Sequence, residues 1–231
     1  MRMILYDFRR ALRSIWFYIA LAASVASLWM DLGTDSYWVL HGSIVDPMEM
    51  LAKALSGSGS ALSLPLLASL PYSANAFQEL SSGAARMAVF RSGRTAYIIS
   101  KLLSTIFAAA LSQASGVLLF TGLLLAACPA AVSPFPAHML ISRLLSAIVF
   151  SIAGGTGALL SKDTVSAIAV PTAMSFTLFM LSARFFTGVW LINPLSWLTG
   201  EIDTILFLCI FLLVMAALYV VILRKEVLRY V

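Results

Sequence analysis

Few residues in this 231-residue chain have both the type and the spacing that catalysis or metal binding needs. Neither His41 nor His138 has a second histidine, a paired cysteine or a glutamate at metal-ligand spacing. Ser115 lies in an apolar run and would need a His or Lys base at the same depth to act as a nucleophile, and no later apolar run carries one. The run Gly154-Gly-Thr-Gly157 lacks the Gly-Lys of a phosphate loop, so we interpret it as a helix-packing feature. We therefore expect that this chain is not an enzyme.

The densest group of charged residues lies in Phe77 to Lys101, which carries four of the fifteen basic residues. Long apolar runs flank this stretch on both sides, so we expect a water-exposed loop between two membrane spans. Four of its residues recur at helical spacing, namely Leu80, Ala84, Met87 and Arg91. This spacing predicts a short amphipathic helix that ends at Ser92-Gly93, after which Tyr97 and Lys101 anchor the next span at the interface. A plainer interpretation is a solvated basic loop that only sets topology.

Composition places the whole chain in a membrane, because 61% of its residues are hydrophobic and only 11% are charged. The length accommodates about six helical spans of roughly 20 residues each, and no large soluble domain. We predict one all-α transmembrane domain over residues 1–231, with spans at 15–30, 60–76, 98–127, 139–160, 164–181 and 204–223. Pro65 and Pro71 kink the second span. Cys128 and Cys209 are interpreted as small hydrophobic residues.

Three further segments have recognisable patterns. Residues 1–14 form a basic amphipathic helix that lies in the interface with Arg9, Arg10 and Arg13 at the lipid headgroups; a cleaved signal peptide is the alternative. Asp46-Pro47-Met48-Glu49 has the cap, proline and acid of a helix start, which predicts a short surface helix ending before Gly57. Many aromatic residues in 182–203 predict segments that dip into the outer leaflet.

Small and polar residues inside the spans suggest contacts and a path. The first span has small residues at close-packing spacing, Ala20, Ala23, Ser24 and Ser27, which indicate a possible dimer contact or an alanine-rich lipid-facing surface. A path through the bundle would be lined by apolar residues, Ser and Thr, with Asn75 and Gln113 as possible polar members.

The distribution of basic residues predicts the orientation. Twelve lie on the side of the termini and the Phe77–Lys101 stretch, against three on the other side, which places both termini in the cytosol of a multi-pass plasma-membrane protein. The net charge of +5 is explained by this asymmetry, so nucleic-acid binding is not expected.

The order Glu79, Gly83, a helical turn, then Arg91-x-x-Arg94-x-x-Tyr97-x-x-x-Lys101 resembles the cytosolic loop between the second and third spans of ABC-2 type transporter permeases. The resemblance implies that residues 78–94 hold a coupling helix that docks on a separate ATPase subunit. It implies that the docking residues are Glu79, Gly83, Arg86, Met87, Phe90, Arg91 and Arg94. It also implies that residues 1–14 are an elbow helix touching the ATPase, and that re-entrant helices precede the sixth span.

The same resemblance implies a working assembly. Two copies of this chain would pair with two ATPase subunits, which would hold the ATP and Mg, so no cofactor is expected on this chain. Export of a hydrophobic or amphipathic cargo, such as a peptide, an antibiotic or a lipid-like molecule, is the expected activity.

Two alternatives remain open. The chain could be a membrane accessory protein, such as an immunity or assembly factor, without transport of its own. It could also be an ion-coupled secondary transporter, although we expect no charged residue in the cores of five spans and expect Arg143 in the fourth to snorkel outward.

Overall fold

The computed structural model describes residues 2–41, 46–128, 133–186 and 188–230, and this part of the chain is built from helices without strands. Five of its helices are long and apolar enough to cross a membrane, namely α2, α8, α9, α10 and α11. The α-helices are α1 (Arg2–Arg13), α2 (Ile15–Leu32), α3 (Asp35–Leu40), α4 (Pro47–Leu55), α5 (Ser58–Ser69), α6 (Asn75–Ser81), α7 (Ala84–Ser92), α8 (Arg94–Ala127), α9 (Ala137–Ser161), α10 (Ser166–Arg184) and α11 (Ile202–Tyr230). This is consistent with the predicted all-α membrane protein, with five helices of spanning length where six spans were predicted.

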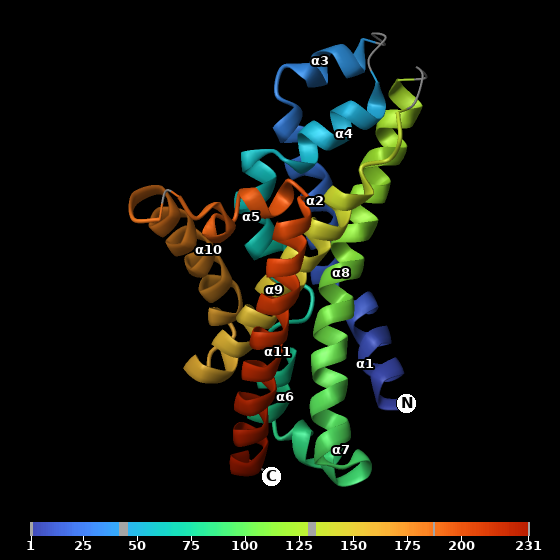
Figure 1. Cartoon of the computed structure of the whole chain (residues 1–231). Coiled ribbons are helices and arrows are strands. Elements are labelled where there is room, and N and C mark those ends of the chain that lie inside the picture. The colour runs from blue at the N-terminus through green and yellow to red at the C-terminus, as the bar shows by residue number, and fades with distance from the viewer. Residues whose placement is uncertain (1, 42–45, 129–132, 187, 231) are drawn as a thin grey trace.

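The long helices run between two ends of the molecule (Figure 1). Both termini lie at the end that also holds α6 and α7, and α3 and α4 lie at the opposite end. Helix α9 is buried along most of its length and packs against α5, α8, α10 and α11. α8 has 34 residues, which corresponds to about 51 Å and exceeds the roughly 30 Å hydrocarbon core of a bilayer. The helix is therefore long enough to extend beyond the membrane.

The predicted second span, residues 60–76, is not one helix. α5 ends at Ser69, the chain turns through 70–74, and α6 begins at Asn75. Pro65 is accommodated inside α5, but Pro71 has no N–H to donate to the preceding turn, and the regular helix stops just before it. α5 alone has 12 residues, about 18 Å, which is too short to cross a bilayer. α5 and α6 together lead the chain from the α4 end to the α7 end (Figure 1).

The predicted surface helix is confirmed as α4. Asp46 accepts a hydrogen bond from the Met48 N–H at 2.9 Å, Pro47 is the first helical residue, and the helix ends before Gly57. Hydrogen bonding from Ser133 and from Met48 holds the pKa of the exposed Asp46 carboxyl below its usual range. The buried face of α4 packs against α2 and α8 and consists of Met48, Leu51, Ala54 and Leu55. Local capping signals were sufficient here because the cap and the helix are adjacent in sequence.

The aromatic segment before α11 is less regular than predicted. It contains two single-turn 3-10 helices, η1 (Trp190–Ile192) and η2 (Ser196–Leu198), in place of re-entrant α-helices. Trp197 is buried and stacks on Phe150 of α9, with ring centroids 5.6 Å apart. Its indole N–H donates to the Leu191 carbonyl at 2.7 Å. Trp197 therefore attaches this segment to the helix bundle.

The glycines of α9 allow close helix packing, as predicted. A Cβ at Gly154 would lie 2.3 Å from the Ala167 carbonyl oxygen of α10, and one at Gly157 would lie 2.7 Å from Val170. At Gly155 the neighbour is the Tyr219 ring of α11, at 2.9 Å. These contacts bring α10 and α11 against the central helix.

We predict that Gly154→Ala destabilises the protein by about 1–3 kcal/mol, because the rigid Ala167 carbonyl cannot move aside without separating α9 from α10. Gly122→Ala is the matched control, since a Cβ at Gly122 meets nothing within 4 Å and alanine favours helix. Thermal unfolding in detergent measures both. Equal midpoints for the two variants would contradict this account of the packing.

Candidate functional site

Lys101 is almost completely buried and is the centre of an ionic cluster. Its ammonium nitrogen donates to Asp7 Oδ1 at 2.8 Å and to Glu79 Oε1 at 2.7 Å, and the three side chains are 1%, 2% and 9% exposed. It also donates to the Tyr72 hydroxyl at 3.3 Å and lies 5.7 and 5.4 Å from the centres of the Tyr72 and Tyr97 rings. Aromatic faces at this distance attract a cation. We call this group the Lys101 cluster; its members are Asp7, Arg10, Tyr72, Asn75, Glu79, Tyr97, Ser100 and Lys101.

The remaining cluster members satisfy both carboxylates. Arg10 Nη1 and the Asn75 amide donate to Glu79 Oε1 at 2.8 and 3.1 Å, and the Tyr97 hydroxyl donates to Oε2 at 3.2 Å. Ser100 Oγ donates to Asp7 Oδ2 at 2.6 Å. Two cations therefore face two anions. Such balance is required because burying an unpaired charge costs several kcal/mol.

The cluster comes from three helices and from Tyr72 in the turn between α5 and α6. α1 supplies Asp7 and Arg10 three residues apart, and α6 supplies Asn75 and Glu79 four residues apart. α8 supplies Tyr97 and its neighbours over one turn. Residues three and four apart share one helix face, so each helix presents its members to the same point.

Sequence reasoning missed two of these roles. We predicted Lys101 as an interface anchor, whereas it is buried, and Asp7 was not singled out. The buried side of α1 is formed by Asp7 and Ala11. One acid within an otherwise basic amphipathic helix was the available signal, but its partner is 94 residues away.

The short helix predicted in this stretch is present as α7, with its end at Ser92-Gly93 as expected. It is shorter than residues 78–94 because Gly83, with φ of 76°, interrupts the helix and separates α6 from α7. Glu79 was expected at the start of this helix; instead it lies in α6, and its carboxylate points into the Lys101 cluster. The buried side chain is therefore not available for direct contact with a partner.

α7 presents apolar surface at the end of the molecule (Figure 1). Phe90 is 91% exposed and Met87 is 62% exposed, whereas Val89 is buried against the bundle. A surface hollow of about 400 Å³ is lined by Arg86, Met87, Val89, Phe90 and Arg94. Of the other predicted docking residues, Arg91 is exposed and Gly83 is half-buried. Most predicted docking side chains thus gather on one exposed helix and its junction with α8.

The three arginines of the predicted elbow helix are exposed. Arg9, Arg10 and Arg13 are exposed, and Arg10 also reaches Glu79.

Ala20 and Ser24 are buried inside the protomer, where α2 packs on α8, and Ser24 Oγ lies 2.9 Å from where a Cβ of Gly116 would be. Ala23 and Ser27 are half-buried. The predicted contact surface is therefore used mainly for packing within one chain.

The two predicted path residues lie in different places. Asn75 belongs to the Lys101 cluster, and Gln113 is buried between α2, α8 and α9. The Gln113 side-chain oxygen accepts from Ser24 Oγ at 3.1 Å and from Arg143 Nη2 at 3.3 Å. Arg143 is fully buried, so the expectation that it snorkels outward is wrong. The guanidinium makes this one hydrogen bond, and its Nε and Nη1 atoms have no hydrogen-bond partner among the described residues.

The structure thus defines an all-α protein with several helices able to cross a membrane, a buried ionic cluster at one end and an exposed apolar helix next to it. A scan against protein-family models and searches of the curated proteins and of the solved structures found no match to this chain.

We predict that Lys101→Met destabilises the protein by about 3–5 kcal/mol, because the buried Asp7 then loses its cation and Glu79 keeps only Arg10. Lys162→Met is the control, since Lys162 is exposed. Adding Asp7→Asn to Lys101→Met removes one uncompensated charge and should recover part of the loss. Thermal unfolding in detergent reports the stability, and a Lys101→Met protein as stable as Lys162→Met would show that the cluster contributes little.

Proposed function

We propose that this chain is the membrane-spanning permease subunit of an ATP-driven exporter of the ABC-2 type. It would act as two copies with two separate ATPase subunits that hold ATP and Mg, and move a hydrophobic or amphipathic cargo out of the cell. The observation that carries the proposal is α7, a short helix bounded by two glycines that leaves Phe90 and Met87 exposed among arginines. An exposed aromatic side chain on a protruding helix is typical of a docking hot spot.

The Lys101 cluster gives the docking surface a physical connection to the bundle. Glu79 lies four residues before Gly83, where the chain turns into α7, and its carboxylate is held by Lys101 of α8 and Arg10 of α1. Movement of α7 by a partner would therefore act on α1, α6 and α8 together. In this proposal Glu79 transmits the partner's movement, while Met87, Phe90 and Arg91 make the contact.

An ion-coupled transporter is the second candidate. It is favoured by ionisable side chains buried in the bundle, the Lys101 cluster and Arg143, because such groups in membrane helices are often functional. An accessory protein without transport is the third. The first test below separates the ATPase-driven proposal from both.

We predict that Phe90→Asp lowers co-purification of a Walker-motif ATPase, expressed from the neighbouring gene, by more than tenfold, because hot-spot truncations typically cost about 2 kcal/mol or more. Phe135→Asp is the control, since Phe135 is 38% exposed and precedes α9. Equal co-purification with both variants would exclude α7 as the docking helix. Absence of any ATPase from the wild-type complex would favour the two alternatives.

A cysteine-accessibility experiment tests the orientation that docking requires. In a background with Cys128 and Cys209 replaced, Ser81→Cys at the exposed end of α6 should resist an impermeant thiol reagent added to intact cells. Ser56→Cys, exposed just after α4, should react. The reverse labelling would place α7 outside the cell and rule out a cytosolic ATPase partner.

A further inference from the structure

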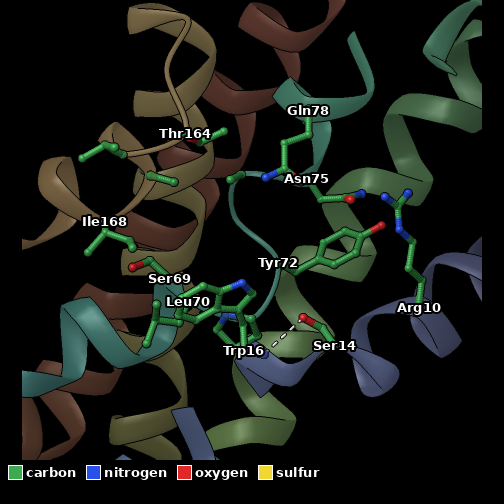
Figure 2. A pocket seen from close by; sticks show the side chains of 14 residues that line it. Arg10, Ser14, Trp16, Ser69, Leu70, Tyr72, Asn75, Gln78, Thr164 and Ile168 are labelled. Carbon is green, nitrogen blue, oxygen red and sulfur yellow. Dashed lines mark hydrogen bonds between the residues drawn. The ribbon is translucent and has the colours of Figure 1, made fainter. Parts of the chain in front are cut away.

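A cavity of about 360 Å³ lies beside the Lys101 cluster, and the proposed docking function does not use it. Its walls come from three parts of the chain (Figure 2): the α1–α2 junction, the break between α5 and α6, and the start of α10. The volume is within the usual range of small-molecule sites, about 300–1,000 Å³.

One wall of the cavity is polar and the other is mainly apolar. Tyr72 and Asn75 point toward the Arg10 guanidinium, and Gln78 lies above them (Figure 2). The apolar lining residues are Trp16, Leu70, Pro71, Ala74, Val165, Ala167 and Ile168.

Arg10 is the one charged residue among those that line the cavity, which include no acid. Its carboxylate partner Glu79 is also held by Lys101. The guanidinium, with hydroxyl and amide groups around it, offers hydrogen-bond donors that suit an anion.

The cavity lies at the level where two candidate spans begin. α2 begins at Ile15, and α10 begins at Ser166, and residues next to both starts line the cavity. Trp16 is 52% exposed at this level, as is common for tryptophan at a membrane–water interface. The exposed Arg9 and Arg13 on α1 add positive charge nearby.

We propose that this cavity binds the headgroup of an anionic phospholipid. The phosphate lies against Arg10, with the Asn75 and Gln78 amides as further donors, and the acyl chains leave along Trp16 and Val165 into the bilayer. The lipid thus contacts the arginine that also pairs with Glu79.

Native mass spectrometry of the detergent-solubilised full chain tests the proposal, with phosphatidylglycerol and phosphatidylcholine as probes. Wild type should retain phosphatidylglycerol more strongly. Gln78→Glu should lower its apparent affinity about fivefold, since one charge near a membrane surface changes binding by about that factor. Ser81→Glu is the matched control, because it adds the same charge on the same helix at an exposed residue outside the cavity.

Two further measurements complete the test. Ala74→Trp, which fills the cavity without changing charge, should also release phosphatidylglycerol, with thermal unfolding used to check that each variant is folded. Soluble glycerol 3-phosphate distinguishes a free phosphate from a lipid and should compete poorly. Equal retention of both lipids by wild type, equal losses in Gln78→Glu and Ser81→Glu, or full competition by glycerol 3-phosphate would each overturn the proposal.

Discussion

The buried ammonium group of Lys101 is the constraint on which the α7 end of the molecule depends. A cation taken out of water needs counter-ions at close range, and here they come from α1 and α6 while the lysine itself is on α8. The three helices must therefore hold one relative position. α1 is consequently part of the packed structure through Asp7 and Ala11, although its arginine-rich face remains exposed as an interfacial helix requires.

This constraint divides the proposed coupling region into a part that the Lys101 cluster holds in place and a part that is exposed to a partner. Glu79 belongs to the fixed part, because four groups hydrogen-bond to its carboxylate. α7 belongs to the exposed part. Gly83 before it and Gly93 after it both adopt positive φ, so the chain changes direction at each end of the helix. Glycine accepts this conformation at little steric cost, so the chain can turn sharply between the two parts. A partner bound to α7 would therefore contact a helix that lies close in sequence to Glu79 and the Lys101 cluster.

Local features of the fold were predictable and long-range ones were not. Five of the six predicted spans correspond to long helices, and Asp46 with Pro47 predicted α4, because each signal lies within the element it forms. The ion pair between Asp7 and Lys101 joins residues 94 positions apart, and no local sequence pattern predicts it. Arg143 was wrongly predicted for the same reason: it is buried, and its hydrogen bond to Gln113 joins residues 30 positions apart. Small residues of α2 predicted close packing correctly but could not indicate that α8 of the same chain is the partner.

The break in the second predicted span connects these observations. Unwound backbone inside a membrane is tolerated only where protein or a polar cavity surrounds it. Pro71, Tyr72 and Ser73 are buried, and Ser73 Oγ lies 3.0 Å from Ser151 Oγ of the central helix. The turn places Tyr72 beside Lys101, and α6 then begins with Asn75 beside Glu79. Pro71 thus interrupts the helix directly before Tyr72, and the turn and the start of α6 supply two neutral side chains that hydrogen-bond within the cluster.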